Sequence, residues 1–537
     1  MTNHLPPVLL GSALPTPLEM ADWDRASSSE FCIPETMLME NAAREAFHVI
    51  SGMLPSYSRV LVVMGNGNNG GDGACLARHL HDAGHTVLVL HAVPLEKLRD
   101  TAKAHAEIAK KTGVRFIPLS LDATGFHVPV EFSGEFSRPN LVVDALLGTG
   151  FTNELREKEL EIIRRINSFC GICPVISLDV PSGLNALSGH PAPEAVRADA
   201  TITFEAAKPG LVFPHAAEYT GVLSVRSIGI PKAVREMRPA SFFLLSPSPE
   251  AWPAPSAAMH KGTAGRVFIF GGSRGMAGAP VLSALGALRN GAGLVTVACP
   301  GGIESQIRSG YPEIMTAPLG HEAVWVPGLI PDCLRIFQDL PHGSALVLGP
   351  GMGKSPQEKE LVSALIEEKQ RPPLVLDADG LAALDTPKIL AALHEDDCIT
   401  PHPGEAARIL HTATDDVQAA RVEALRALTD ATKATVVLKG AGTLIGKAGF
   451  PIFIAPFATP SLAVGGSGDV LSGVIAAFMA QMRSHYPYSF HFHNAFHAAA
   501  LGVFVHGKAG RLLDDAYPHR GALAREIAEA IPRVPRA

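Results

Sequence analysis

Short apolar runs alternate with longer segments of helical periodicity along the first half of the chain. The run Val60 to Val63 precedes a helix expected from Asp72, and Thr86 to Leu90 precedes a helix expected from Thr101. Such alternation predicts an α/β fold, with a parallel sheet covered by helices. Further strands of this region are expected at Leu141 to Val143, Val175 to Leu178, Thr201 to Phe204 and Leu223 to Val225.

A second alternating region begins at Arg266, after a change in composition. The segment Ser246 to Pro255 carries four prolines, which predicts an exposed linker because proline interrupts helices and central strands. The two regions do not share glycine motifs, so we expect two different α/β domains in tandem, 16–235 and 259–537, with a proline-rich linker at 236–258. Strands of the second region are expected at Val267 to Phe270, Val295 to Ala298, Ala345 to Leu348, Leu374 to Leu376 and Val436 to Lys439.

Composition narrows the kind of partner. The chain has 537 residues, 47% of them hydrophobic, and a formal net charge of -7. It therefore has material for large cores and no excess of cations for nucleic acid or an anionic membrane. No apolar run reaches the roughly 20 residues of a membrane span, and Met1 to Pro15 lacks the pattern of a secretory signal. We expect a cytoplasmic protein with small-molecule partners.

The cysteines do not indicate a disulfide framework. There are seven, an odd number, and they are scattered. Cys170 and Cys173 form a Cys-x-x-Cys pair, but the pair precedes a strand-like run instead of opening a helix. A redox or metal role for this pair is therefore not favoured.

A glycine-rich segment from Ala463 to Gly473 places Asp469 at the start of an expected apolar helix. Glycines let the backbone approach an anion, and the free N–H groups of a first helical turn favour negative charge. We expect the Asp469 carboxylate to stay ionised in this field. It would then accept the proton of an alcohol that takes up a phosphoryl group.

A first glycine cluster, Gly65 to Gly73, follows a strand and opens a helix. Gly65, Gly67 and Gly70 match the spacing G-x-G-x-x-G, but the next strand ends without the acidic residue that a dehydrogenase places there. The cluster instead adds amide and carboxylate oxygens, at Asn68, Asn69 and Asp72. Oxygen-rich loops of this kind suit a polar ligand or a hard cation.

Two further aspartates, Asp144 and Asp179, follow strands that should end at the same edge of the sheet. Either one alone is as easily a helix cap or a turn residue. Together with Asp72 they favour a ligand site, since ligands of parallel sheets bind beyond the carboxyl ends of the strands.

These motifs, with Asp144 to Gly150, Leu178 to Leu184 and Thr203 to Leu211, resemble the YjeF N-terminal domain, the NAD(P)H-hydrate epimerase, over roughly Leu18 to Pro231. The resemblance implies a Rossmann-like fold and exchange of R and S epimers at the hydrated ring carbon, with Asp179 as the acid/base. It implies a potassium ion held by Asn69, Asp144 and Ser182. The residues it implies for the hydrated cofactor are Asn68, Asn69, Gly70, Gly71, Asp72, Gly148, Thr149, Gly150 and Asp179.

In the second half, several motifs lie at expected strand ends. Gly349 to Ser355 invites a P-loop interpretation, which fails because the first required glycine falls at Leu348. The remaining motifs can face one cleft together with the Asp469 turn. They are Gly271 to Pro280, Asp377 to Gly380, Thr400 to Glu405 and Leu438 to Thr443.

These motifs resemble the ribokinase-like fold and, more narrowly, the ADP- or ATP-dependent NAD(P)H-hydrate dehydratase, from roughly His260 to the C-terminus. The resemblance implies phosphorylation of the ring hydroxyl with Mg²⁺, Asp469 acting as the base, and then loss of phosphate. The residues implied for ADP are Lys439, Gly440, Ala441, Gly442, Thr443 and Gly468. Those implied for the hydrated cofactor are Gly278, Ala279, Gly353, His402 and Asp469.

Other residues of the second half have less specific interpretations. Family members often have Asn-Pro where this chain has Thr459-Pro460, so the amide is lost and a hydroxyl is kept. Glu405 is either a ligand of Mg²⁺ through water or an acid of a first helical turn, and we favour the second. His493 and His497 stand one helical turn apart, but without a third ligand a packing role is favoured over zinc.

We therefore predict a bifunctional repair enzyme that epimerises hydrated NADH and NADPH (NADHX and NADPHX) and dehydrates the S form at the expense of ADP. ADP is expected because the fused arrangement resembles bacterial members. Two alternatives stay open: an ATP-dependent kinase of a small alcohol, such as a vitamin precursor, fused to a cofactor-binding domain, and a non-catalytic cofactor-binding protein. A homo-oligomer is expected.

Overall fold

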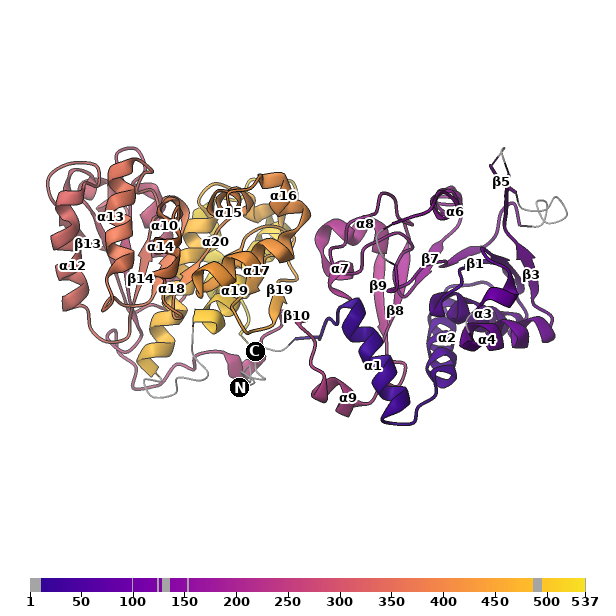
Figure 1. Cartoon of the computed structure of the whole chain (residues 1–537). Coiled ribbons are helices and arrows are strands. Elements are labelled where there is room, and N and C mark those ends of the chain that lie inside the picture. The colour runs from indigo at the N-terminus through magenta and orange to yellow at the C-terminus, as the bar shows by residue number, and fades with distance from the viewer. Residues whose placement is uncertain are drawn as a thin grey trace. The chain divides into compact units, whose positions relative to one another are not determined.

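The computed structural model describes residues 11–98, 100–122, 125–127, 136–151, 154–485 and 495–536. It divides into two compact units, each described here by itself (Figure 1). The N-terminal unit spans Ala13–Phe242, and the C-terminal unit comprises the residues from Phe243 onward together with Gly11 and Ser12.

A parallel sheet forms the centre of the N-terminal unit. Within the described residues it has seven strands in the order β3-β2-β1-β6-β7-β8-β9, all parallel to their neighbours. The order reverses between β1 and β6, so this is the switch point at which ligands of such sheets bind. The strands are β1 (Arg59–Met64), β2 (Thr86–His91), β3 (Arg115–Pro118), β6 (Leu141–Ala145), β7 (Val175–Leu178), β8 (Ala200–Phe204) and β9 (Val222–Arg226). A separate hairpin pairs β4 (Ser120–Asp122) with β5 (Gly125–His127).

Helices cover this sheet and complete its core. The helix α3 packs on β1, β2 and β6 between α2 and α4. Ile162, Ile163 and Ile166 of the helix α6 pack in the apolar cluster that includes Leu61 and Val142 of the sheet. The helices are α1 (Pro17–Ser29), α2 (Glu35–Ser51), α3 (Asn68–Asp82), α4 (Asp100–Lys111), α6 (Glu157–Asn167), α7 (Pro209–Val212), α8 (Ala217–Thr220) and α9 (Lys232–Met237).

The C-terminal unit is built on a larger mixed sheet. Its ten described strands have the order β10-β19-β18-β17-β16-β15-β14-β11-β12-β13. The strands from β13 to β17 along this order are parallel, and β18 and β19 are antiparallel additions. Their bounds are β10 (Phe242–Leu244), β11 (Arg266–Phe270), β12 (Leu294–Pro300), β13 (Met315–Leu319), β14 (Ser344–Leu348), β15 (Leu374–Leu376), β16 (Cys398–Ile399), β17 (Thr435–Leu438), β18 (Leu444–Gly446) and β19 (Ile452–Ile454).

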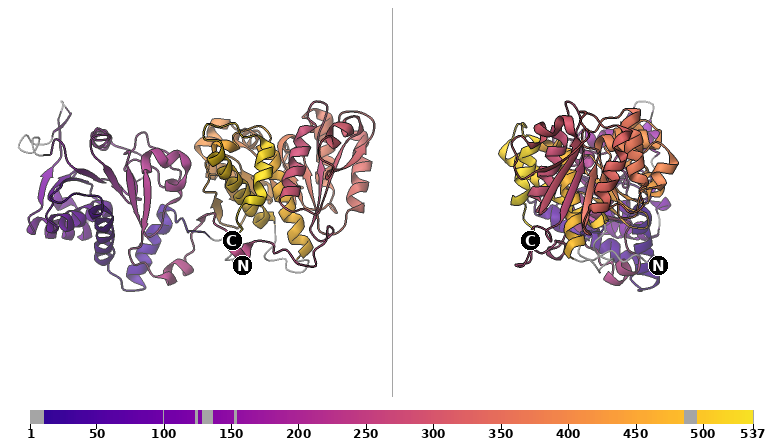
Figure 2. Two further views of the ribbon diagram at one scale, coloured as in Figure 1. Left: turned by 180° about the vertical axis from the view of Figure 1, so that it is seen from behind. Right: turned by 90° about the vertical axis from the view of Figure 1, so that its left-hand side faces the viewer.

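Close helix packing fixes the start of α18 in this unit. The helices α10, α18 and α19 lie side by side, and α18 also packs on β11, β14 and β15 (Figure 2). A Cβ at Gly473 would lie 1.9 Å from the carbonyl oxygen of Ser283, and one at Gly286 would lie 2.3 Å from that of Val470. Glycine is therefore required at both positions for α10 and α18 to approach this closely.

The other helices of the C-terminal unit surround the sheet, with α17 against β17 and β18. The bounds are α10 (Gly278–Arg289), α11 (Glu304–Arg308), α12 (Ile330–Asp339), α13 (Pro356–Glu367), α14 (Pro387–Ala391), α15 (Pro403–Leu410), α16 (Thr414–Ala419), α17 (Arg421–Thr432), α18 (Ser467–His485), α19 (Ala495–Ala516) and α20 (Ala524–Ala530). Across the described part of the chain, no helix is both long and apolar enough to cross a membrane.

The proline-rich segment is less exposed than its composition suggests. The strand β10 joins the edge of the larger sheet beside β19, and Ala251 and Pro253 are buried. The ring of Trp252 lies 6.1 Å from the rings of Phe478 and Phe504. The expectation of an exposed linker fails at these residues because an indole and its apolar neighbours gain more from packing than from solvent.

Candidate active sites

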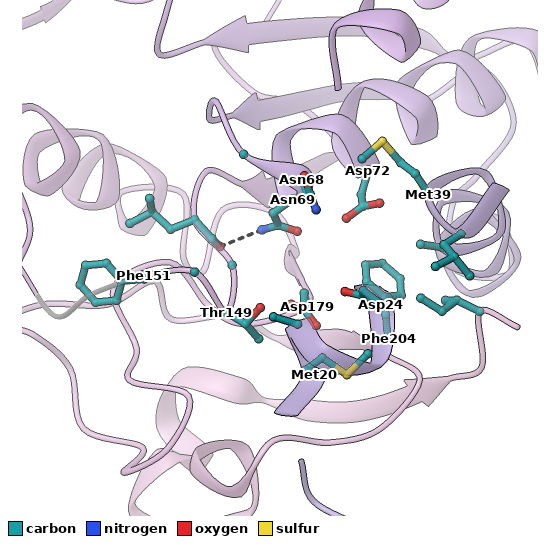
Figure 3. Close-up of a pocket in the computed structure, with 18 of the residues that line it drawn as sticks. Met20, Asp24, Met39, Asn68, Asn69, Asp72, Thr149, Phe151, Asp179 and Phe204 are labelled. Carbon is teal, nitrogen blue, oxygen red and sulfur yellow. Dashed lines mark hydrogen bonds between the residues drawn. The ribbon is translucent and has the colours of Figure 1, made fainter. Parts of the chain in front are cut away.

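A cavity of about 360 Å³ lies at the switch point of the N-terminal sheet (Figure 3). The loops that follow β1, β6 and β7 form part of its wall, together with α1, α2 and the start of α3. The end of β8 and the segments that follow β8 and β9 complete it. Its lining residues are Met20, Ala21, Asp24, Glu35, Leu38, Met39, Ala42, Asn66, Gly67, Asn68, Asn69, Asp72, Leu146, Leu147, Gly148, Thr149, Gly150, Phe151, Asp179, Phe204, Lys208 and Ile228.

The first turn of α3 presents polar side chains to this cavity. The helix begins at Asn68, earlier than the expected start at Asp72, because Gly67 with φ -91° and ψ -168° is its extended N-cap. Asn68, Asn69 and Asp72 line the cavity, as expected for ligand contacts.

The glycines between these residues have a packing role. A Cβ at Gly70 would lie 2.3 Å from the carbonyl oxygen of Gly65, and one at Gly71 would lie 2.6 Å from the sulfur of Met39. Neither Gly70 nor Gly71 is among the lining residues, so the structure does not bring these two into the cavity wall.

The three residues expected to hold potassium meet beside the loop after β6. Asp144 is fully buried and accepts hydrogen bonds from the Ser182 hydroxyl at 2.6 Å and the Ser177 hydroxyl at 2.8 Å. Burial raises the pKa of Asp144, although these hydrogen bonds oppose the rise. The amide nitrogen of Asn69 donates to the Leu147 carbonyl at 2.7 Å, and its buried Oδ1 has no hydrogen-bond partner among the residues that the structure describes.

Asp179 stands in a strained turn at the end of β7, with a φ of 62° that non-glycine residues rarely adopt. Its carboxylate forms an ion pair with Lys208, whose side chain is 1% exposed. The Lys208 ammonium also donates to the Thr203 hydroxyl at 2.9 Å and to the Phe204 carbonyl at 3.2 Å. Lys208 lies within a motif of the sequence resemblance, but sequence reasoning gave it no role.

Three more carboxyl groups, those of Asp24, Glu35 and Asp72, line the cavity with Asp179. Burial raises the pKa of Asp24 to about 6, and the charge of Asp179 adds to the rise. Burial, with Asp179 and Asp24 nearby, raises the pKa of Asp72 well above its usual value. Asp24 was missed from sequence, since an acid on the helix α1 carries no motif signal that separates it from a solvated surface residue.

In the C-terminal unit, the expected residues gather at the carboxyl edge of the sheet. Lys439 follows β17 and donates to the Asp377 carboxylate at 2.9 Å, with Glu405 at 3.8 Å. A Cβ at Gly468 would lie 3.3 Å from the Lys439 nitrogen, which brings the glycine-rich turn to the same point. Although burial opposes it, the charges of Asp377 and Glu405 raise the pKa of Lys439.

The expectation that the Asp469 carboxylate stays ionised is wrong for the ligand-free protein. Burial raises the pKa of Asp469 to about 8, and Asp377, Asp379 and Glu405 add to the rise while Lys439 opposes it. A helix N-terminus favours a carboxylate by about 0.3–1 kcal/mol, which lowers a pKa by less than about one unit. The start of α18 therefore cannot offset burial among other carboxylates.

Asp377, which sequence reasoning quoted only as part of a motif, is central to this cluster. It is buried and accepts a hydrogen bond from the Thr400 hydroxyl at 2.7 Å. Its Oδ2 has no hydrogen-bond partner among the described residues. The cluster thus offers a buried carboxylate oxygen beside Lys439 and Gly468.

His402 and Glu405 form a capping box at the start of α15. The His402 Nδ1 accepts from the Gly404 backbone at 3.0 Å, and the Glu405 carboxylate accepts from the His402 backbone at 2.8 Å. This agrees with the interpretation of Glu405 as an acid of a first helical turn. Burial lowers the pKa of His402, so its ring stays neutral near pH 7.

The loops expected to hold the hydrated cofactor meet next to this cluster. A Cβ at Gly351 would lie 3.1 Å from the Cβ of Ala279, so the first turn of α10 packs on the loop after β14. In that loop the Gly353 nitrogen donates to Asp379 at 3.0 Å. Gly278 is the first residue of α10, and a Cβ there would meet no described atom within 4 Å.

The nucleotide loop from Lys439 to Thr443 has a half-buried arginine, Arg421, behind it. Arg421 donates to the Leu438 carbonyl at 3.2 Å and to the Lys439 carbonyl at 3.3 Å. Gly440 has a φ of 139°, and a Cβ there would lie 2.7 Å from the Arg421 guanidinium. Burial lowers the pKa of Arg421 to about 10. Sequence reasoning missed this residue.

The remaining sequence predictions fall outside these two sites. The Thr459 hydroxyl is buried with no hydrogen-bond partner in the described structure. His497 forms a hydrogen bond with the Ala251 carbonyl at 2.9 Å, whereas His493 lies outside the described residues. Cys170 is exposed, Cys173 is buried, and both are free thiols.

Comparisons with known proteins agree with this division. The family model for the YjeF-related protein N-terminus matches residues 35–210, and that for NAD(P)H-hydrate dehydratase matches residues 267–533. The chain is 35% identical over 533 residues to a bifunctional NAD(P)H-hydrate repair enzyme of Moorella thermoacetica, covering 97% of this chain and 96% of the relative. It is 34% identical over 504 residues to one of Coxiella burnetii, covering 92% and 94%. Among solved structures, it is similar to an ADP/ATP-dependent NAD(P)H-hydrate dehydratase of Bacillus subtilis, with 24% identity, 53% and 94% coverage and a TM-score of 0.44.

Proposed function

The chain belongs to the family of bifunctional NAD(P)H-hydrate repair enzymes, and from this membership we propose how its two units act. It epimerises the R and S forms of NAD(P)H hydrate and dehydrates the S form to NAD(P)H, in a YjeF N-terminal unit and a ribokinase-like unit. Relatives that align over nearly the whole chain carry the double activity, which favours it over the small-alcohol kinase and over a non-catalytic protein. We retain 16–235 and 259–537 as the limits of the two domains.

The cavity of the N-terminal unit is the proposed epimerase site. Asn68, Asn69, Asp72 and the loop from Gly148 to Gly150 would hold the hydrated cofactor, since all of them line the cavity. Gly70 and Gly71 support this wall from behind. Asp179 is the proposed acid/base, because its carboxylate lines the cavity and is held there by the ion pair with Lys208.

Asn69, Asp144 and Ser182 have the donor set that a potassium ion requires. The unpartnered Oδ1 of Asn69, the buried Asp144 carboxylate and the Ser182 hydroxyl are hard oxygen donors around one loop. A bound potassium ion would supply positive charge beside the phosphates of the substrate. The protein residues would then hold the loop after β6 in place.

The Lys439 cluster is the proposed dehydratase site. Asp469 would take the proton of the ring hydroxyl while the hydroxyl oxygen attacks the terminal phosphoryl group of ADP. The bond between the terminal phosphorus and the bridging oxygen of ADP breaks, and AMP leaves. Phosphate then leaves the ring with its bonding electrons while the ring nitrogen lone pair forms a C=N bond. Loss of a proton from the neighbouring ring carbon to the released phosphate restores the reduced nicotinamide. Gly278, Ala279, Gly353 and His402 would line the hydrated ring beside this base.

The nucleotide and Mg²⁺ complete the proposed site. The loop from Lys439 to Thr443 and Gly468 would hold ADP, with Lys439 near the phosphates. The donor set fits Mg²⁺, because the buried Oδ2 of Asp377 has no hydrogen-bond partner in the part of the chain that the structure describes. Mg²⁺ binds through one or two carboxylates and substrate phosphates. Bound Mg²⁺ would offset the negative charge of phosphates and carboxylates, which would help Asp469 to ionise.

The meeting of Lys439, Gly468 and Asp469 is the observation that carries the dehydratase assignment. The test is to add either ADP or ATP to the protein with a mixture of R and S hydrates of NADH and follow the absorbance of reduced nicotinamide. We expect full recovery with ADP and Mg²⁺. Recovery of the absorbance with ATP but not with ADP would overturn the choice of ADP. No recovery with either nucleotide would overturn the assignment of the dehydratase site.

We further propose a cytoplasmic location and a homo-oligomeric state. All seven cysteines are free thiols, which suits a reducing compartment. The edge strand β9 exposes Val222 and Val225, and exposed apolar edges often pair with another chain. Light scattering after size-exclusion chromatography tests the oligomer, and a monomeric mass would contradict it.

A further inference from the structure

Asp24 is a cavity residue to which the proposed function gives no role. It lies on α1, far in sequence from the glycine cluster and the strand-end motifs. In Figure 3 the carboxyl groups of Asp24, Asp72 and Asp179 reach the same cavity from three different elements. Asp24 forms no hydrogen bond or ion pair with any other described residue, so its carboxyl group is available to a ligand.

The surroundings of Asp24 favour a carboxyl group that exchanges protons near neutral pH. Burial raises its pKa to about 6, and Asp179, Glu35 and Glu205 add to the rise while Lys208 opposes it. Asp179, in contrast, is in direct contact with the Lys208 ammonium. The cavity therefore holds two carboxyl groups whose raised pKa values suit them to carry a proton, Asp24 and Asp72, and one that the Lys208 ammonium contacts, Asp179. Asp72 is already assigned to cofactor binding, which leaves Asp24 for the proton.

Epimerisation at a hydrated ring carbon needs both kinds of group. The lone pair of the ring nitrogen forms a C=N bond as the C–O bond breaks, and the departing hydroxyl takes a proton from an acid and leaves as water. Water then adds to the other face of the carbon, the C=N electrons return to nitrogen, and a base takes the proton that the water loses. Protons and electrons balance, because the acid and the base have exchanged protonation states.

We propose that Asp24 is a second catalytic carboxyl group of the epimerase and shares one proton with Asp179. Asp24 gives the proton to the departing hydroxyl, and Asp179, beside Lys208, takes the proton of the returning water. In the reverse direction the roles exchange. The inference rests on the assignment of Asp179 as acid/base, but its test is separate.

The test compares Asp24→Asn with Asp22→Asn, which alters an acid on the same helix that pairs with Arg238 at 3.0 Å. Epimerisation is followed by chromatographic separation of R and S hydrates, with ADP omitted. We expect Asp24→Asn to lower kcat by about 10²- to 10⁴-fold with little change in KM, and Asp22→Asn to leave both unchanged. An unchanged kcat, or a raised KM alone, would show Asp24 to be a binding residue and would overturn the proposal.

The pH profile separates a catalytic role from a structural one. For the wild type and Asp22→Asn, kcat/KM should fall at alkaline pH, where the shared proton is lost. The residual activity of Asp24→Asn should lack this alkaline limb, and a limb that persists would overturn the proposal. If Asp24→Asn unfolds the N-terminal unit, Asp24→Glu replaces it as the test variant. A lowered kcat with a retained alkaline limb would then support a catalytic carboxyl group at this position. Loss of the alkaline limb would contradict it. Failure of Asp179→Asn to affect epimerisation would instead overturn the Asp179 assignment.

Discussion

The two candidate sites use the same kinds of groups in different arrangements. Each places a lysine among several carboxylates at the carboxyl ends of parallel strands. In the N-terminal unit, Lys208 pairs directly with Asp179, the proposed acid/base. In the C-terminal unit, Lys439 pairs with Asp377 instead, and Asp469, the proposed base, has a pKa of about 8 because of burial and its acidic neighbours.

The difference shows where each site obtains the charge that its chemistry needs. The epimerase takes no nucleotide as a second substrate, and the cation in direct contact with its proposed acid/base is Lys208, a residue of the protein. In the proposed dehydratase site, a nucleotide and Mg²⁺ would bring positive charge to Asp469 only when they bind. A base that ionises on nucleotide binding would limit proton transfer to the complete complex.

The largest effect is expected from removing the dehydratase base. Asp469→Asn should lower the rate of NADH recovery by about 10²- to 10⁴-fold, since no other group takes the ring hydroxyl proton. Epimerisation measured on the same preparation should not change. Equal loss of both activities would contradict the separation of the two sites.

Removing the lysine of the epimerase should have a slightly smaller effect. Lys208→Met keeps the apolar stem but leaves the Asp179 carboxylate without its cation, and we expect epimerisation to slow by about 10²- to 10³-fold. Dehydration of purified S hydrate is the internal control. If epimerisation stays above a tenth of the wild-type rate, Asp179 does not depend on Lys208.

Potassium should stabilise only the unit that holds its ligands. At ten times its dissociation constant, a ligand that binds only the folded state adds about 1.4 kcal/mol to the free energy of unfolding. In calorimetry, potassium in place of lithium should raise the melting temperature of the N-terminal unit, and Ser182→Ala should reduce this gain. Equal stabilisation of both units would point to a general salt effect.

The smallest effect is expected at the arginine behind the nucleotide loop. Arg421→Lys keeps the charge but cannot bridge the Leu438 and Lys439 carbonyls, so about 1 kcal/mol of loop stability is lost. KM for ADP should rise by about fivefold with kcat nearly unchanged. Arg426→Lys, an exposed position on the same helix, is the control, and an equal rise there would contradict a specific role for Arg421.

Features that depend on local sequence could be predicted. The strand at Val175 to Leu178 was found with its bounds, because a buried parallel strand is a short and mostly apolar run. Asp144, Asp179 and Lys439 were placed at one edge of each sheet because they follow such runs. Strands such as β16, with two residues, are too short to carry a pattern.

Features that depend on tertiary surroundings could not. Nothing near Asp24 in sequence shows that α1 faces the cavity, and the roles of Gly70 and Gly71 depend on Gly65 and Met39, which lie on other segments. The ionisation of Asp469 was predicted from its own helix, but the neighbours that raise its pKa follow other strands. Sequence located the chemical groups, whereas their protonation depends on the fold.

The pH dependence of dehydration tests this contrast most directly. The value of kcat/KM for ADP reports on the free enzyme, and kcat reports on the complete complex. Because a base must be unprotonated, kcat/KM should fall as pH drops below about 8, the pKa of Asp469. The acidic limb of kcat, measured with saturating Mg²⁺ and ADP, should lie at clearly lower pH. Acidic limbs at the same pH in both profiles would contradict the account, because the base would then ionise without help from the bound nucleotide.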